Sequence, residues 1–543
     1  MNNAIVDAFE PHNEPVRAYL PGSPERQELA DELDWQSREP IEIPLIINGR
    51  EVRTGVTLPV VMPHDHHHVL AVCHQAREQE VDLAIRSALD AREAWLTMSW
   101  VERASIFLKA AELLSKKYRA RINAATMLGQ GKNAFQSEID AACESIDYLR
   151  YNIYFAGEIY NQQPKSDSTT LNRIEYRPLE GFVLAISPFN FTAIGLNLST
   201  SPAIMANTVV WKPAPTAVLS NYHVMRLLLE AGLPAGVINF IPGDGQLVGG
   251  IALGHRCLAG LHFTGGTATF NHLWRGVCKN LDGYRMYPRL VGETGGKGFV
   301  VVHPSADALE VAVALVRGGF EYQGQKCSAA SRAYIPRSLW PNIRDLLLGM
   351  LAEIRMGDVR DLDNFMNAVI DERAFDRIMG YIDRARGTPD AEILFGGTGD
   401  KSSGYFVQPT VIQAFDPHFV TMEEEIFGPV LTVHVYEDEQ FEQTLRLCDQ
   451  TSPYALTGAI FARDRDVLVR ACRVLRHAAG NFYYNDKPTG AMVGMQPFGG
   501  ARRSGTNDKA GGFMNMVRWT SPRTIKETFQ PATSWRYPYM TGS

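Results

Sequence analysis

The sequence lacks the features that mark several specialised classes of protein. Its seven cysteines are scattered over 543 residues and form no C-x-x-C pair, which argues against a disulfide framework and a zinc ribbon. No apolar run reaches the roughly 18 residues of a membrane span. A net charge of −7 leaves no excess of the basic side chains that bind nucleic acids or membrane surfaces. Met1–Glu10 has no basic or apolar stretch typical of a targeting segment, so we expect a soluble, cytoplasmic enzyme.

Two long helical patterns, at about 79–96 and 101–128, and a strand-like segment at Asn172–Arg177 are expected in the first third of the chain, and apolar runs alternate with helical patterns through most of the remainder. Phe182–Ile186, Val209–Lys212 and Leu258–Phe263 have the pattern of buried strands, and helical segments separate them. A second set of such runs starts at Gly298–Val302. Strands that alternate with helices at this pitch predict βαβ units and parallel, doubly wound sheets. We therefore predict an α/β protein with two such domains and a smaller accessory element.

The strongest local signal for chemistry is the segment Phe320–Ala329, which contains Cys327. This cysteine follows a Gly-Gln-Lys turn and precedes small residues. A reactive thiolate needs an electropositive and partly open environment, and a nearby cation such as Lys326 would lower the pKa of the thiol. A cysteine in such a segment is by itself more often a buried apolar residue, so its interpretation depends on its partners.

Two polar residues are candidate partners of this cysteine. Glu293 lies in a Gly-flanked segment between apolar runs, where partial desolvation would raise its pKa and make it a general base. Asn190 follows a buried strand and Pro188, and its amide could donate a hydrogen bond to an oxyanion. The alternatives are a surface-turn glutamate and a turn-capping asparagine.

Two further segments concern ligands. Phe263-Thr-Gly-Gly266 opens a predicted helix, and backbone N–H groups at such a start suit a pyrophosphate. The histidine-rich run His64–His68 lacks cysteine or carboxylate partners at helical spacing, so we interpret it as a solvated loop. We expect no metal in the mechanism.

Taken together, these segments resemble the aldehyde dehydrogenase superfamily from about residue 14 to residue 530. The order of the motifs carries the resemblance, and Glu293 lies 34 residues before Cys327, as the family pattern requires. Within the superfamily the chain is most similar to the branch that oxidises glutamate γ-semialdehyde. The segments that carry this finer resemblance include Asn13-Glu-Pro-Val, Gly129-Gln-Gly-Lys, Phe320–Ala329, Gly480-Asn-Phe-Tyr-Tyr-Asn-Asp-Lys and Ser504-Gly-Thr-Asn-Asp-Lys.

The resemblance implies a covalent mechanism with NAD as cofactor. Cys327 would attack the aldehyde, and the amide of Asn190 would hold the oxyanion with the backbone N–H of Cys327. Glu293 would activate the water that hydrolyses the thioester. The implied cofactor-binding residues are Ser187, Lys212, Thr264, Gly265, Gly266, Glu425 and Phe427. The implied substrate-binding residues are Phe191, Lys326, Ser328, Gly490, Ala491 and Phe498.

The resemblance also implies a division of the chain and a metabolic setting. The expected parts are an N-terminal arm (1–40), an NAD-binding domain (41–160 and 181–292), an oligomerisation element (161–180 and 505–543) and a catalytic domain (293–504). The enzyme would act in proline catabolism as a homodimer or higher homo-oligomer, with proline dehydrogenase as a candidate partner.

Two alternatives stay open at this point. Pro215 stands where many NAD-preferring members of the superfamily carry a glutamate, which weakens the case against NADP. The substrate could be another carboxylated aldehyde, such as succinate semialdehyde. A CoA-acylating enzyme is disfavoured because Glu293 is present, and a non-enzymatic relative is disfavoured because Cys327, Glu293 and Asn190 are all retained.

Overall fold

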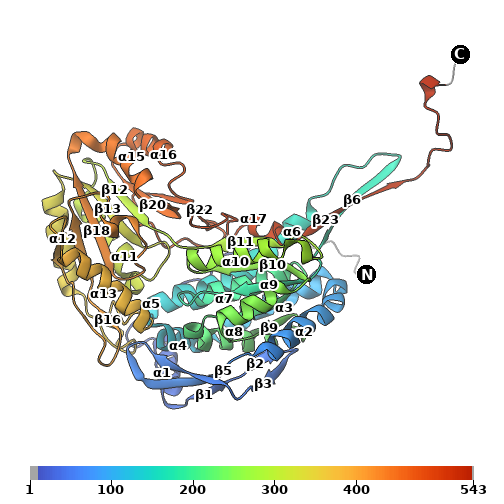
Figure 1. The fold of residues 1–543 in the computed structure, drawn as a ribbon, viewed down its shortest axis with the longest axis horizontal. Helices are drawn as coiled ribbons and strands as arrows, with labels where there is room; N and C mark the ends of the chain where they lie inside the picture. Colours follow the sequence, from blue (N-terminus) through green and yellow to red (C-terminus); the bar gives the residue numbers. More distant parts are fainter. Residues whose placement is uncertain (1–9, 541–543) are drawn as a thin grey trace.

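The structure is a computed structural model and describes residues 10–540. One sheet of seven strands occupies the centre of the larger lobe in Figure 1, in the order β11-β10-β7-β8-β9-β2-β3. Its strands are β2 (Leu45–Ile47), β3 (Arg50–Val52), β7 (Phe182–Ile186), β8 (Thr208–Lys212), β9 (Ile238–Phe240), β10 (Leu258–Thr264) and β11 (Arg289–Glu293). The strands from β11 to β9 are parallel, and β2 and β3 close one edge as an antiparallel hairpin.

Helices cover both faces of this sheet because its strands are apolar on both sides. Val183 of β7 belongs to one core, whereas its neighbour Leu184 belongs to the other, since successive side chains of a strand point to opposite faces. The helices of the first face are α3 (Trp100–Ser115), α4 (Arg119–Gln130), α6 (Ser145–Asn161), α7 (Thr192–Ile204) and α8 (Val218–Ala231). Those of the second face are α2 (Glu78–Thr97), α9 (Gly245–Gly254) and α10 (Thr267–Lys279). The predicted doubly wound arrangement is confirmed.

The second sheet has the order β14-β17-β18-β13-β12-β20-β21. Its strands are β12 (Gly298–Val302), β13 (Ala330–Pro336), β14 (Ala391–Phe395), β17 (Thr410–Ala414), β18 (Val430–Tyr436), β20 (Thr457–Phe461) and β21 (Asn481–Tyr484). All neighbours are parallel except β14 and β17. Helices α11 (Ala308–Phe320) and α12 (Trp340–Glu353) pack on one face, and α15 (Phe441–Thr451) and α16 (Arg465–Val474) on the other. Helix α13 (Glu372–Arg386) lies beside β14.

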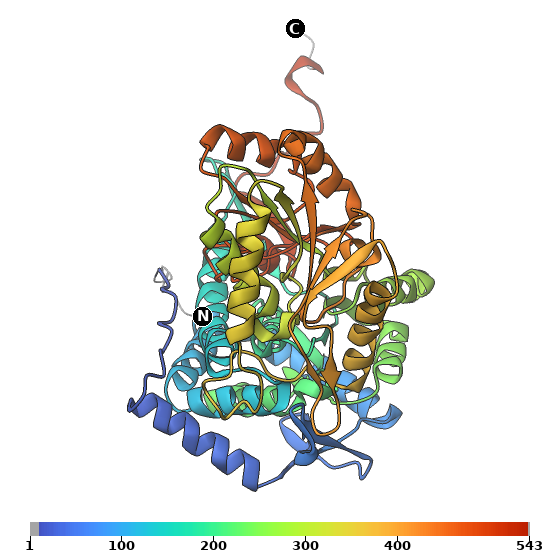
Figure 2. The same cartoon turned by 90° about the vertical axis from the view of Figure 1, so that its left-hand side faces the viewer.

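The N-terminal region, expected as an arm, contains a helix that was not predicted from the sequence. Helix α1 (Pro24–Arg38) packs on α4 and buries Leu29 and Leu33, and Figure 2 shows it along the base of the molecule. The next strands form a small sheet of β1 (Ile41–Ile43), β5 (Asp65–His74) and β4 (Thr57–Met62). The prediction of a loop at His64–His68 is wrong, because most of this run belongs to β5 and His64 is buried.

One predicted helix is divided in the structure, and one predicted strand begins two residues earlier than expected. A single helix predicted at about 101–128 is divided into α3 and α4, because Lys116 leaves the helical region with φ −118° and ψ −85°. The expected strand near Asn172–Arg177 is β6 (Thr170–Arg177), which pairs along its whole length with β23 (Ser521–Thr528). This ribbon projects from the body beside the C-terminal segment (Figure 1). No helix of residues 10–540 is long and apolar enough to cross a membrane.

The remaining elements are short. They are α5 (Ala134–Ser137), a π-helical turn (Glu138–Glu144), α14 (Val420–Glu423), α17 (Phe513–Val517), β15 (Gly399–Asp400), β16 (Phe406–Val407), β19 (Tyr454–Ala455) and β22 (Ala501–Arg502).

Candidate active site

Most of the predicted site residues gather where the two large sheets face each other, whereas Glu293 and Lys212 line neither of the two cavities described below. The parallel strands β7, β10 and β11 end at Ile186, Thr264 and Glu293, so their carboxyl ends deliver the segments that follow to one edge. Ligands of open α/β sheets bind at this edge. The second sheet contributes its amino ends, since Cys327 precedes β13 and Glu425 precedes β18. The site is therefore built from segments that regular strands hold in place.

Two cavities meet at the thiol-bearing residue. The first, the cleft cavity, has a volume of about 400 Å³ and is lined by Cys327 and by Ser187, Asn190, Thr264, Gly265, Gly266, Glu425 and Phe427. The second, the arm cavity, has a volume of about 260 Å³ and reaches Glu14 in the N-terminal region. It is lined by Cys327 and by Phe191, Lys326, Ser328, Gly490, Ala491 and Phe498. Of the predicted site residues, only Cys327 lines both cavities.

The environment of Cys327 differs from the electropositive one that its neighbour suggested. Burial raises the pKa of the thiol well above its ordinary value, and the carboxylates of Glu293 and Glu425 raise it further. The ammonium of Lys326 does not serve the thiol, because its Nζ donates to Oε2 of Glu321 at 3.1 Å. A thiol with a raised pKa needs a proton acceptor before it can attack.

A constrained turn positions Cys327. Tyr322, Gln323 and Gly324 are consecutive residues with φ of +51°, +54° and +65°, a left-handed conformation that costs non-glycine residues about 1–3 kcal/mol each. Hydrogen bonds hold the turn: Tyr322 Oη donates to the carbonyl of Gln130 at 2.9 Å, and Gln323 Nε2 donates to that of Gly131 at 2.8 Å. Such strain is typical of functional sites.

Asn190 is tied to the same turn. Its Nδ2 donates to the backbone carbonyl of Gln325 at 3.1 Å, and its side chain is buried at the end of the cleft cavity. The amide is therefore bonded to a residue that precedes Cys327 by two positions in the chain, and this bond fixes its orientation. One N–H of the amide is used in this bond, and the second suits an oxygen bound beside the thiol.

Glu293 is the last residue of β11 rather than part of a loop. Its backbone carbonyl accepts from the N–H of Gly265 at 3.1 Å. Its Oε2 is buried without a hydrogen-bond partner in the described part of the chain. Burial raises the pKa of this carboxyl well above 4.5, and Lys509 opposes the shift. A carboxylate with one unpaired oxygen and a raised pKa is a suitable proton acceptor.

Hydrogen bonds or a helix start fix the positions of several predicted cofactor-binding residues. Gly266 is the N-cap of α10, as the sequence predicted for a helix start. Glu425 Oε1 accepts from the N–H of Gly296 at 2.7 Å, and burial raises its pKa to about 7. Ser187 Oγ accepts from Trp211 Nε1 at 3.1 Å. Lys212, which ends β8, is buried but does not line the cleft cavity.

Sequence reasoning missed Thr489, which lines the arm cavity, and the pair Lys132 and Asp140, which lies behind its wall. Thr489 shares a hydrogen bond of 2.7 Å with Ser328. Lys132 pairs with Asp140 at 2.6 Å, both fully buried, and its Nζ lies 3.9 Å from the centroid of the Phe191 ring. Asp140 also accepts from the N–H groups at the start of α7, at 3.0 and 2.9 Å. The segment Gly129–Lys132 contributed to the resemblance, but Asp140 and Thr489 carry no motif.

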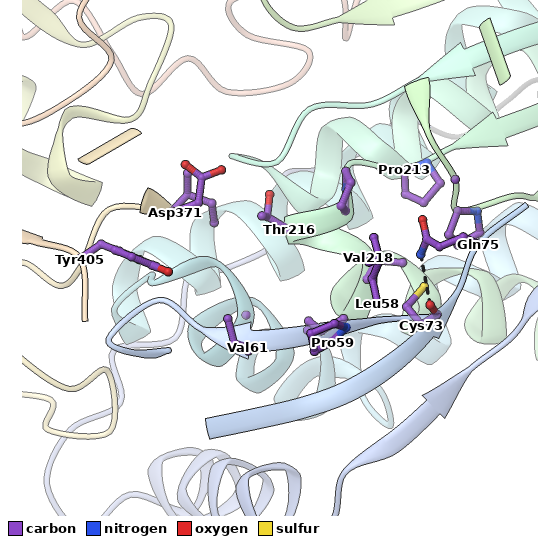
Figure 3. Close-up of a pocket in the computed structure, with 16 residues that line it drawn as sticks. Leu58, Pro59, Val61, Cys73, Gln75, Pro213, Thr216, Val218, Asp371 and Tyr405 are labelled. Atoms are coloured by element: carbon purple, nitrogen blue, oxygen red, sulfur yellow. Dashed lines mark hydrogen bonds between the residues drawn. The ribbon is translucent and has the colours of Figure 1, made fainter. Parts of the chain in front are cut away.

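A third cavity lies apart from these two. It has a volume of about 120 Å³ between β4, β5 and the segment after Lys212, with Asp371 and Tyr405 on its far side (Figure 3). None of the predicted site residues lines it.

Comparisons with known proteins add to this geometry. The model of the aldehyde dehydrogenase family matches residues 51–525. The mitochondrial Delta-1-pyrroline-5-carboxylate dehydrogenase of Dictyostelium discoideum is 54% identical over 533 residues, which is 98% of this chain and 96% of that protein. The human mitochondrial protein of that name is 50% identical over 97% of this chain and 94% of its own length. The NAD-bound structure of the Delta-pyrroline-5-carboxylate dehydrogenase from Mycobacterium tuberculosis has a TM-score of 0.96 and 52% identity, with both chains fully covered.

Proposed function

The chain belongs to the aldehyde dehydrogenase family, and on that premise we propose that it oxidises glutamate γ-semialdehyde to glutamate with NAD⁺ in proline catabolism. The relatives named above, similar over nearly their whole length, support the activity. The observation that carries the chemistry is the position of Cys327 at the junction of the cleft cavity and the arm cavity. A thiol at this point is open to an aldehyde from one side and to a cofactor from the other.

The cleft cavity fits a dinucleotide. It lies at the carboxyl edge of a parallel sheet, and its wall includes the N-terminus of α10, whose free N–H groups suit a pyrophosphate. Ser187, Thr264, Gly265 and Gly266 would hold NAD on this wall, and Glu425 and Phe427 would hold its nicotinamide ribose. Lys212 would contact the adenosine ribose. When bound, NAD⁺ supplies the acceptor for the hydride.

The protein's own groups carry the remaining steps. Cys327 Sγ gives its proton to water in the site and forms a bond to the aldehyde carbon, and the electron pair of the carbonyl moves to oxygen. The amide of Asn190 and the backbone N–H of Cys327 donate to that oxygen. After the hydride has left, the acyl group is a thioester. Glu293 takes a proton from water, the water oxygen bonds to the acyl carbon, and the C–S bond breaks to release the carboxylate and restore the thiol.

The arm cavity fits the carboxylated end of the substrate. Ser328 and the backbone of Gly490 and Ala491 would donate to the α-carboxylate, a neutral donor set that binds an anion without a buried countercharge. Phe191 and Phe498 would line the aliphatic chain. Lys326 also lines this cavity, but its pairing with Glu321 directs the charge away from the thiol.

Initial rates of NADH formation with Δ1-pyrroline-5-carboxylate and with succinate semialdehyde test the proposal. We expect a clear preference for the first, and equal rates would contradict it. Replacing NAD⁺ by NADP⁺ in the same assay tests the cofactor preference that Pro215 leaves open.

The setting of the enzyme is also a proposal. We infer a homodimer or higher homo-oligomer in which the projecting ribbon of β6 and β23 takes part, together with the domain division given above. We keep a cytoplasmic location, which cell fractionation tests directly because the Dictyostelium and human relatives are named as mitochondrial. Proline dehydrogenase would supply the substrate.

A further inference from the structure

A single side chain of the N-terminal region is bonded to the loop that carries Gly490 and Ala491. Asn13 Nδ2 donates to the backbone carbonyl of Val493 at 2.9 Å and to Asp147 Oδ2 at 2.8 Å. Its Oδ1 accepts from Tyr151 Oη at 3.0 Å. Both N–H bonds and the carbonyl of this amide are therefore engaged. We infer that Asn13 is a positioning residue that sets the carboxylate-binding loop and thereby the preference for carboxylated aldehydes.

The loop depends on contacts from outside because its backbone is unusual. Gly490 and Gly494 have φ of +95° and +79°, so two left-handed residues enclose Ala491 and Val493. A Cβ on Gly494 would lie 2.1 Å from Cε1 of Tyr151, which shows how closely the loop approaches α6. Glycine at such positions permits the fold but adds conformational freedom. An external hydrogen bond at Val493 therefore reduces the freedom of the residues that precede it.

Asn13 is itself held by hydrogen bonds to helix α6. Asp147 and Tyr151 both belong to α6, so the amide bridges that helix and the loop. The next residue reinforces the attachment: the N–H of Glu14 donates to Asp147 Oδ1 at 2.7 Å, and its carboxylate pairs with Arg119 at 2.6 Å. The charge on Asp147 is thus shared between two donors of the same segment.

Asn13 precedes the part of the chain that matches the aldehyde dehydrogenase family. The match to the aldehyde dehydrogenase family begins at residue 51, so Asn13 lies outside the part that carries the shared chemistry. A residue that acts on the loop but not on Cys327 changes how the carboxylate is held, and leaves thiol attack and hydride transfer intact. This inference rests on the proposed function, because it assigns a carboxylate to Ser328, Gly490 and Ala491.

The test compares two aldehydes with two variants. Asn13→Ala should raise KM for glutamate γ-semialdehyde about 3- to 10-fold, the size expected for one or two lost hydrogen bonds. It should change kcat less than about twofold and leave kcat/KM for propanal unchanged, since propanal has no carboxylate. Tyr151→Phe removes only the donor to Asn13 Oδ1, and should shift KM in the same direction by a smaller factor.

Tyr19→Phe is the matched control. It removes two hydrogen bonds of the same segment away from the loop, from Tyr19 Oη to Glu138 at 2.7 Å and from Asn123 Nδ2 to Tyr19 Oη at 3.0 Å, and should leave KM at the wild-type value. The inference is overturned if Tyr19→Phe reproduces the change, if Asn13→Ala loses activity on both aldehydes in parallel, or if its KM does not move. Wild-type enzyme that prefers propanal to the semialdehyde would instead refute the proposed function, and this result is obtained before any variant is made.

Discussion

The cleft cavity and the arm cavity share one thiol but are built in different ways. The cleft cavity is formed by strand ends, glycines and a helix N-terminus, and all the residues that line it lie within the matched family region, whereas the arm cavity is also lined by Glu14 and Val16, which precede that region. The arm cavity gathers segments from distant parts of the chain, and acidic side chains line it at Glu14, Glu144, Asp147 and Glu321. The contrast teaches that the N-terminal region reaches the cavity proposed for the substrate and not the one proposed for the cofactor.

Removing the shared residue should have the largest effect. Cys327→Ala should lower NADH formation by more than about 10³-fold, because no other group can form the covalent intermediate. Binding of NAD⁺, measured by calorimetry, should persist because the walls of the cleft cavity are untouched. Retained turnover would show that the two cavities are not coupled through this thiol.

Changing the base should separate the two chemical phases. Glu293→Gln keeps the shape of the side chain but cannot accept the proton from water, so the steady-state rate should fall about 10²–10⁴-fold. Rapid-mixing measurements should still show a first turnover of NADH. An equal loss in the burst and the steady state would remove Glu293 from the hydrolytic step.

Breaking the ion pair behind Phe191 should affect stability. Lys132→Met leaves Asp140 charged and buried, which costs about 3–5 kcal/mol of unfolding free energy. Urea unfolding at fixed protein concentration measures this loss. The double variant Lys132→Met/Asp140→Asn should recover part of it, and an unchanged midpoint in the single variant would show that the pair does not support this wall.

The pH dependence should report the burial of Glu293. Since burial raises the pKa of this carboxyl, the basic form is gained only as the pH rises well above 4.5. Hydrolysis of the thioester should therefore increase with pH through that raised value, and the limb should disappear in Glu293→Gln. A limb at the ordinary pKa of a glutamate would contradict the desolvated environment.

The smallest effect should come from the partner of Ser328. Thr489→Val keeps the shape of the side chain and removes one hydrogen bond of 2.7 Å, so KM for the semialdehyde should rise about 2- to 10-fold. Thr489→Ser should restore it. A fall in kcat with an unchanged KM would place Thr489 in the chemical step instead of substrate binding.

The sequence predicted the sheets well because their pattern is local. The predicted strands Phe182–Ile186 and Gly298–Val302 coincide with β7 and β12. The family and the fold class were also predicted correctly, because short motifs beside the strands are recognisable in the sequence. The break at Lys116 was not predicted, because no proline or glycine marks it. Helix α1 was not predicted either, although Ser23 caps it and Pro24 begins it, which are ordinary start signals of a helix.

The site was only partly accessible from the sequence. Cys327, Asn190 and Glu425 belong to motifs that can be recognised in the sequence, and the structure brings all three to the cleft cavity. The expected effect of Lys326 on the thiol was wrong, because adjacency in sequence does not fix where a long side chain points. The contacts of Asn13 with Val493 and of Asp140 with α7 join residues more than 50 positions apart, so no local pattern records them.

The shared position of Cys327 has a consequence for the order of events in turnover. On the proposed mechanism, an acyl group bonded to Sγ would extend into the arm cavity, and of the residues that line either cavity no other belongs to both. The thioester would then leave the cleft cavity clear for the nucleotide. Reduced cofactor could depart while the acyl group is still attached, and the two products would not have to leave together.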